Sequence, residues 1–181
     1  MRFYGLSQSG KLFFEPVDNI LPIESKHVAY IRIIDCYGAP KSYNDAWMRL
    51  REFGEKSSLL NKNTEWIGLC FDNPTITKPE KCRFYACFTT SESVKPMGAF
   101  GSHEIKGGLY AVFVLKEAYS GLMKLYRNIY IHWLPNSDYD LRNGESFELY
   151  LNSPSQVSED EILTEVYLPI ERKRKRVLRN A

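Results

Sequence analysis

The sequence predicts one α+β domain assembled from two tandem strand-helix-strand-strand modules. Its 181 residues fit a single domain, and its apolar fraction of 44% is large enough to bury a core. Segments of strand character and of helical spacing follow one another in the same order in both halves. Tyr30 and Tyr110 are 80 residues apart, as are Pro74 and Pro154, and this shift aligns the strand pairs. We interpret the pattern as an internal duplication of a small unit that buries its sheet face by pairing with its copy.

The first module is expected to begin with a strand. Residues His27–Ile34 are rich in β-branched side chains and are bounded by turn residues, which is typical of a strand. Apolar residues then recur at helical spacing across residues 43–53. Trp66–Phe71 and Cys82–Thr89 are predicted strands, with a turn at Asp72–Pro74 between them.

The second module repeats this order. Leu109–Lys116 is the predicted first strand, and apolar residues at helical spacing over 122–133 predict the helix. Phe147–Leu151 and Leu163–Leu168 are the predicted second and third strands.

Alternation along the strands predicts which side chains share a face. The all-apolar face of the Phe147–Leu151 strand is expected to pack under the helices. Glu148 and Tyr150 are then on the other, helix-free face, with Trp66 at its edge. The further residues expected under the helices are Ile67, Leu69, Phe71, Phe84, Ala86, Phe88, Thr164, Val166 and Leu168. The further residues expected on the helix-free face are Tyr30, Arg32, Tyr85, Cys87, Tyr110, Val112, Glu165 and Tyr167. That face is therefore predicted to be rich in tyrosine, with Glu148 near its middle.

Two terminal segments are expected to lie outside the domain, which spans residues 20–170. Residues 1–19 show no clear period and predict an irregular leader. Residues 171–181 form a basic tail, and the run Glu171–Arg176, with five basic residues and one acidic residue, carries +4 against a formal charge of +2 for the whole chain. Because the rest of the surface is close to neutral, we expect no direct, sequence-specific binding of nucleic acid.

The sequence predicts a soluble, cytoplasmic protein without a membrane partner. It lacks a basic segment followed by an apolar run and a cleavage site, and no run of about eighteen apolar residues occurs. Cys36, Cys70, Cys82 and Cys87 have neither the paired spacing nor the neighbouring histidines of a zinc site, so reduced thiols and no metal are expected.

Familiar catalytic and cofactor motifs are absent from the sequence. There is no Gly-x-Ser-x-Gly elbow, and His27, His103 and His132 have no paired spacing. Lys106–Gly108 precedes a strand and does not open a helix, so a turn is favoured over a phosphate loop. We expect no cofactor and no dedicated catalytic residue.

Three blocks of sequence resemble a known family. Trp66–Pro74, Lys106–Val112 and Ser146–Asn152 are similar to the aligned blocks of the GyrI-like (gyrase-inhibitor-like) effector-binding domain, which also occurs in AraC-type regulators and multidrug-responsive activators. The resemblance covers about residues 20–170. It implies a pseudo-twofold axis between the two modules and a central pocket whose glutamate is Glu148. Where family members commonly have Gly-Pro-Tyr, this chain has Asp35-Cys36-Tyr37 and keeps only the tyrosine.

The expected site is an aromatic pocket with a carboxylate at its base. Aromatic rings attract a desolvated cation, and Glu148 would complete the selection for positive charge. The alternative is that Glu148 is a solvated strand residue and that the aromatics only pack in the core. The expected wall residues are Tyr37, Trp66, Tyr85, Tyr110, Tyr150 and Trp133.

Three functions remain open from the sequence. The first is a stand-alone protein that senses or sequesters a cationic or amphipathic compound, or that modulates DNA gyrase as the family name implies. The second is the effector-binding part of an AraC-type regulator, either as a piece of a longer chain or working with a separate DNA-binding partner. The third, implied by some relatives, is a hydrolase of cyclopropane-bearing toxins with Glu148 as general base.

Overall fold

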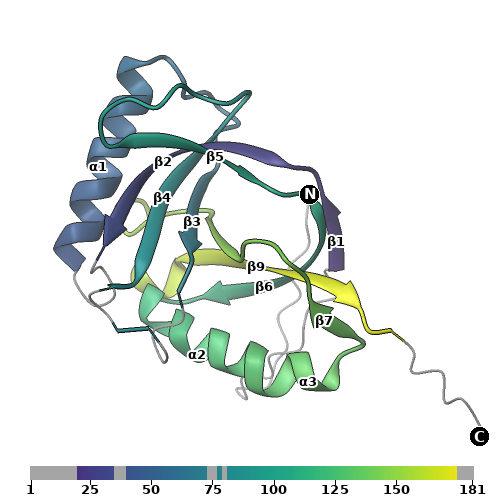
Figure 1. The fold of residues 1–181 in the computed structure, drawn as a ribbon. Helices are drawn as coiled ribbons and strands as arrows, with labels where there is room; N and C mark the ends of the chain where they lie inside the picture. Colours follow the sequence, from purple (N-terminus) through teal and green to yellow (C-terminus); the bar gives the residue numbers. More distant parts are fainter. Residues whose placement is uncertain (1–19, 35–39, 73–76, 79–80, 175–181) are drawn as a thin grey trace, which may run out of the picture.

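The computed structural model describes residues 20–34, 40–72, 77–78 and 81–174, which form a sheet-rich α+β fold. Helices α1 and α2 cover the outer face of one large sheet (Figure 1). The strands follow the order β1-β6-β9-β8-β3-β4-β2-β5, and β7 pairs with β9. The pairings recorded within these residues are all antiparallel.

The predicted elements of the first half are present, together with one strand that the sequence did not suggest. The elements are β1 (Ile20–Ile23), β2 (Lys26–Ile34), α1 (Pro40–Lys56), β3 (Trp66–Cys70) and β4 (Arg83–Thr90). The four-residue strand β1 was not predicted, and its Pro22 is a residue that argues against a strand. Pro22 is tolerated because β1 bonds to a single neighbouring strand, β6, on one side.

The second half contains the predicted strands and helix and two additional strands, β5 and β7. Its strands are β5 (Phe100–Ile105), β6 (Gly108–Lys116), β7 (Tyr139–Leu141), β8 (Phe147–Tyr150) and β9 (Leu163–Arg172). Its helical segments are η2 (Tyr119–Gly121), α2 (Leu122–Asn128), the π-helical η3 (Ile129–Trp133), α3 (Leu134–Asn136) and η4 (Glu159–Glu161). The helix widens to π spacing just before Pro135, which has no N–H for the carbonyl of Ile131.

The sheet closes on itself through one bent ribbon. β2 pairs with β5 starting at Lys26↔Ile105, and β1 pairs with β6 starting at Ile23↔Gly108. Residues 24–25 connect β1 to β2, residues 106–107 connect β5 to β6, and the same pairing register continues across both connectors. The connectors touch, since a Cβ on Gly107 would lie 2.7 Å from the backbone nitrogen of Ser25. Only glycine fits there. β1 and β2 therefore act as one bent strand, and β5 and β6 as another, which joins the two edges of the sheet (Figure 1).

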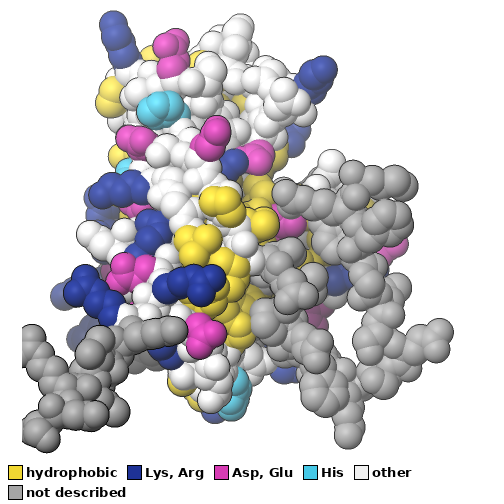
Figure 2. All heavy atoms as spheres, turned by 90° about the vertical axis from the view of Figure 1, so that its right-hand side faces the viewer, with side chains coloured by type: hydrophobic (Ala, Val, Ile, Leu, Met, Phe, Trp, Pro, Cys, Tyr) yellow, Lys and Arg dark blue, Asp and Glu magenta, His cyan; other side chains and the backbone are white. Residues whose placement is uncertain are grey.

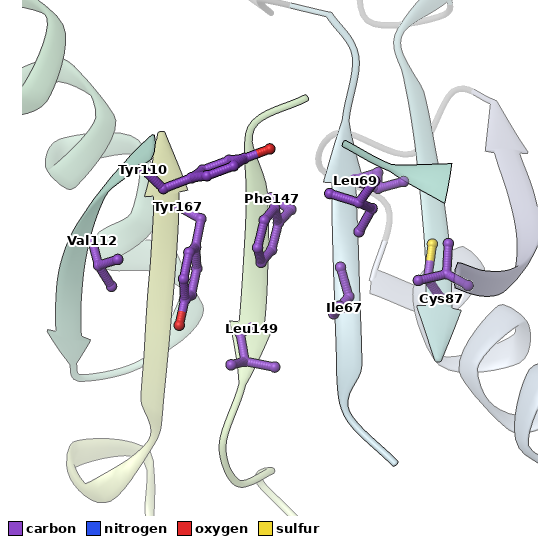
Figure 3. Packing of buried hydrophobic residues seen from close by; sticks show 10 residues of the cluster. Ile67, Leu69, Cys87, Tyr110, Val112, Phe147, Leu149 and Tyr167 are labelled. Carbon is purple, nitrogen blue, oxygen red and sulfur yellow. The ribbon is translucent and has the colours of Figure 1, made fainter. Parts of the chain in front are cut away.

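Closure gives the helix-free face a core of its own. Phe147 stacks on Tyr167 with ring centroids 4.4 Å apart, and Tyr110 meets Phe147 edge-on at 5.5 Å (Figure 3). The buried members of this interior cluster are Val28, Ile67, Leu69, Cys87, Ile105, Tyr110, Val112, Phe147, Leu149 and Tyr167. Two separate clusters lie under the helices, one with α1 and one with α2.

The predicted orientation of two central strands is wrong. On β3 and β8 the apolar residues, such as Ile67 and Phe147, face the interior cluster, and Glu148 and Tyr150 face the helices. The predicted orientation of β4 and β9 is confirmed, because Phe84, Ala86, Phe88, Val166 and Leu168 lie under the helices. The error arose because the helix-facing side was taken as the side with the purely apolar residues. In a closed sheet both sides are buried, so an apolar side is not necessarily the side that the helices cover.

The surface of the described residues carries mixed charge where Figure 2 views it. An apolar strip is flanked there by both basic and acidic side chains, and neither sign dominates that face. In the described part of the chain, no helix has the length and apolarity that crossing a membrane requires.

The last strand extends into the segment that the sequence assigned to a tail. β9 runs to Arg172 and pairs there with Tyr139 of β7. Lys173 donates to the carbonyl oxygens of Pro135 at 3.3 Å and Ser137 at 2.7 Å.

Candidate functional site

Glu148 lies at the centre of the sheet, on the face that carries the helices. It is directly opposite Gly68 of β3, and only 4% of its surface is exposed. The hydroxyl of Tyr150 donates to its Oε2 at 2.6 Å, and the hydroxyl of Tyr126 donates to its Oε1 at 3.1 Å. The thiol of Cys70 lies 3.7 Å from Oε1. Three separate segments, β8, α2 and β3, thus converge on one carboxylate.

Gly68 makes the short Tyr150 bond possible. Tyr150 is two residues after Glu148 on the same face of β8. A Cβ at position 68 would collide with the hydroxyl of Tyr150 and would lie 2.8 Å from the ring of Phe84. The missing side chain therefore provides the space in which the phenol reaches the carboxylate.

Burial controls the protonation of this cluster. It raises the pKa of Glu148, and the hydrogen bonds from Tyr150, Tyr126 and Cys70 oppose that rise. Burial, followed by the nearby Glu148, holds the pKa values of Tyr126 and Tyr150 well above the usual range. Both phenols stay neutral and act as donors.

Glu148 has no cationic partner among the residues that the structure describes. The ion pairs found there involve other carboxylates, namely those of Asp45, Glu52, Glu65, Asp72 and Glu145. Neutral hydroxyls solvate the negative charge only partly, and a buried charge without a counterion is costly. A positively charged group that reached Glu148 would be strongly favoured.

One aromatic ring from α1 and one from η2 pack against the ring of Tyr150. The ring of Trp47 on α1 lies edge-on to it at 5.6 Å, and the ring of Tyr119 on η2 lies edge-on at 5.5 Å. Trp66 of β3 continues this wall, 6.1 Å from Trp47. Tyr119 is near enough for Glu148 to add to the rise in its pKa that burial causes. The site is therefore a carboxylate bordered by electron-rich rings.

The structure brings some of the predicted wall residues to Glu148 and not others. Tyr150 contacts it directly, and Trp66 lies on the same face. Tyr85 stacks on Tyr30 at 4.3 Å on the helix-free side, packed against the interior cluster. Tyr110 is fully buried in that cluster, and its hydroxyl donates to the carbonyl of Lys106 at 3.0 Å.

Two further predicted residues lie elsewhere. Trp133 is at the far end of the helical segment, where it meets Phe113 at 4.9 Å and stacks on Tyr139 at 6.5 Å. The position of Tyr37 lies outside the described residues.

Sequence reasoning did not assign four residues to the site. Trp47 and Tyr126 lie within the two predicted helices, but those helices were expected on the opposite face from Glu148. Tyr119 and Cys70 were not expected in contact with it. The sequence carries one related signal, Gly68, since a glycine opposite a strand carboxylate leaves space for a neighbouring side chain, which here is Tyr150.

The described residues contain no group of three or more His, Cys, Asp or Glu side chains arranged to hold a metal ion. The chemistry available at Glu148 is that of hydrogen bonds, one carboxylate and aromatic faces.

Comparison with known proteins gives a family match. The model of the GyrI-like small molecule binding domain matches residues 19–171. The probable transcriptional regulator YgiV of Escherichia coli K12 is 31% identical over 109 residues, which are 59% of this chain and 68% of that protein. A DNA gyrase inhibitor of Salmonella typhimurium is 29% identical over 112 residues, covering 60% of this chain and 71% of the inhibitor.

Solved structures share the fold. The EcmrR C-terminal domain superposes with a TM-score of 0.71 at 20% identity, covering 86% of this chain and 97% of that domain. In an EcmrR–DNA complex the TM-score is 0.72 at 19% identity, and the match covers 86% of this chain but only 57% of the EcmrR chain. The structure of SAV2435 bound to tetraphenylphosphonium has a TM-score of 0.56 at 16% identity and covers 84% of this chain and 93% of that one.

The family match and the similarity to YgiV agree with the resemblance of the three sequence blocks. The prediction of family membership is confirmed: the chain belongs to the GyrI-like small molecule binding domain family.

Proposed function

We propose that this chain binds an amphipathic, cationic small molecule at Glu148 and acts as a sensor or sequestering protein for it. One observation carries the proposal: a buried carboxylate is solvated by neutral phenols and lacks a cationic partner among the described residues. The family description, a small molecule binding domain, supports a ligand at this type of site.

Two attractive interactions with a cation support this proposal. A charge-assisted hydrogen bond or ion contact with Glu148 is worth about 1.5–3 kcal/mol. Each aromatic face adds about 0.5–2 kcal/mol toward a desolvated cation. The rings of Trp47 and Tyr119 lie next to Tyr150, and these three rings would supply such faces to a ligand that entered beside them. A cation with apolar substituents would use both interactions, whereas an anion would be repelled by Glu148.

We also propose that the site lies where two structural modules meet. β3 and β8 are the central pair, with Gly68 opposite Glu148. The strand order on either side of this pair is consistent with the pseudo-twofold relation that the resemblance implies. Residues 20–170 would then form the ligand-binding unit, and α1 and α2 would close the site from its two sides.

A role as the effector-binding part of a transcription regulator is the second candidate. The EcmrR C-terminal domain has the same fold, and the match covers 57% of the EcmrR chain in its DNA complex. In this role the DNA contact would come from a further segment of a longer chain or from a separate partner, since we expect no sequence-specific DNA contact from this domain. DNA gyrase is a further candidate partner, because a gyrase inhibitor is among the relatives.

The proposed function is tested by comparing two ions of the same shape and opposite charge. Tetraphenylphosphonium and tetraphenylborate would each be titrated into the protein while tryptophan fluorescence is followed. Trp47 and Trp66 lie beside the site and report on it. We expect saturable quenching by the phosphonium and none by the borate over the same range. Equal binding of both ions, or binding of the borate alone, would refute a cation-selective site.

A further inference from the structure

Thr164 of β9 is a buried polar residue that the site described so far does not use. Its side chain is fully buried, and its Oγ1 has no hydrogen-bond partner in the described part of the chain. Buried hydroxyls are nearly always paired, because leaving one unpaired costs free energy. An unpaired hydroxyl at a ligand site is a candidate contact for the ligand.

The strand register places Thr164 beside the site. It is directly opposite Tyr150 of β8, and Glu148 is directly opposite Val166, two residues further along β9. Side chains opposite each other share a face, so Thr164 and Glu148 are diagonal neighbours on the helix-covered side. The spacing of such diagonal neighbours is about 7 Å.

One partly exposed side chain, Tyr119, borders this part of the sheet. Tyr119 lies edge-on to Tyr150, and 36% of it is exposed at the outer surface. An exposed tyrosine changes rotamer at little cost on a fast timescale. A ligand that displaced the ring of Tyr119 would enter beside Tyr150 and come within reach of Thr164.

We propose that Thr164 is a specificity residue that forms a hydrogen bond with a second polar group of the ligand. This inference rests on the proposed function at Glu148 and narrows its ligand class. The preferred ligand is then an aromatic cation with a hydrogen-bonding group, such as a primary aromatic amine, several ångströms from its positive centre. Cations without such a group bind through Glu148 and the rings alone.

Two fluorescent dyes of the same ring system test the inference. Proflavine carries two primary amines, and acridine orange carries dimethylated amines in their place, while both are singly positive at neutral pH. Thr164→Val keeps the shape of the side chain and removes the hydroxyl, and Thr164→Ser keeps the hydroxyl. We expect Thr164→Val to weaken proflavine binding roughly fivefold and acridine orange binding by less than about twofold. Thr164→Ser should retain the wild-type preference for proflavine.

The ratio of the two affinities separates a ligand contact from a structural role. Loss of an unpaired buried hydroxyl should raise the melting temperature of Thr164→Val, but folding stability alone leaves the dye ratio unchanged. An unchanged ratio in Thr164→Val overturns the inference.

Glu148→Gln separates this failure from failure of the proposed function. If Glu148→Gln weakens both dyes while Thr164→Val leaves their ratio unchanged, only the role of Thr164 is wrong. If Glu148→Gln affects neither dye, or the wild-type protein binds neither, the cation site itself is wrong, and the inference fails with it.

Discussion

Glu148 carries an energetic cost in the absence of ligand. Burial raises its pKa, and the hydroxyls of Tyr150 and Tyr126 compensate only in part. Sites that bind or react commonly keep such unfavourable groups, because the ligand later supplies the missing partner. Removing the charge should therefore stabilise the empty protein and harm its function.

The first prediction concerns the stability of Glu148→Gln without ligand. The folded-state pKa of Glu148 lies above its unfolded value. The carboxyl therefore contributes most to the free energy of unfolding at pH values below the unfolded pKa, and this contribution is lost as pH rises through the folded pKa. We expect the variant to be more stable than wild type at pH 7, by roughly 0.5–2 kcal/mol. The difference should shrink toward pH 4, where the wild-type carboxyl is protonated.

Denaturant unfolding at the two pH values measures this effect. A variant that is less stable than wild type at pH 7 would mean that the hydrogen bonds to the carboxylate outweigh the cost of its burial.

The second prediction concerns the phenol that bonds to Glu148. Tyr150→Phe removes the 2.6 Å hydrogen bond that favours the ionised carboxylate, so the pKa of Glu148 should rise further. The pH midpoint at which cation binding is lost on acidification should shift upward. Tyr167→Phe is a matched control, since its hydroxyl donates to Glu165 at 2.7 Å within the closed sheet. The midpoint should not move in the control, and equal shifts in both variants would contradict the assignment.

At the scale of the elements, the main strands and helices could be predicted because each has a clear period. β2 and β6 are runs of β-branched and aromatic residues, and α1 has apolar residues at helical spacing. β5 and β7 escaped prediction because their sequences, Phe-Gly-Ser-His-Glu-Ile and Tyr-Asp-Leu, have little strand character of their own. They form because neighbouring strands offer them hydrogen-bonding partners.

The site could be predicted only in part for a reason of geometry. The alternation of side chains along the strand correctly predicted that Glu148 and Tyr150 share one face and that Phe147 and Leu149 share the other. It could not say which side the helices cover, because closure of the sheet buries both sides. Because the helix-covered side was assigned wrongly at Glu148, Tyr85 and Tyr110 were expected to line the site and Trp47 and Tyr126 were not.

The third prediction concerns the end of β9. Removing residues 171–181 deletes the pairing of Arg172 with Tyr139 and the two hydrogen bonds of Lys173. We expect a loss of about 1–3 kcal/mol in unfolding free energy, the worth of a few hydrogen bonds. Removing only residues 175–181 leaves these contacts in place and is the matched comparison. The two truncations, compared by denaturant unfolding, would contradict this account if they were equally stable.

At the scale of the whole molecule, closure of the sheet divides the protein into two environments. The interior is filled by large side chains such as Tyr110, Phe147 and Tyr167, which packs the closed sheet from within. The outer face carries α1 and α2, and Glu148 lies on the central strand pair beneath them. The proposed ligand site is thus on the helix-covered side, apart from the interior cluster.

The central claim is that the charge of Glu148 selects the ligand, and calorimetry on Glu148→Gln tests it most directly. Tetraphenylphosphonium and the neutral triphenylphosphine oxide would be titrated into wild type and variant, with Glu159→Gln as a surface control. We predict that Glu148→Gln weakens phosphonium binding by about 1.5–3 kcal/mol, or roughly 10- to 150-fold. Binding of the neutral compound should change by less than about 0.5 kcal/mol. If the variant binds the phosphonium as tightly as wild type does, Glu148 is a structural residue and the site does not select for charge.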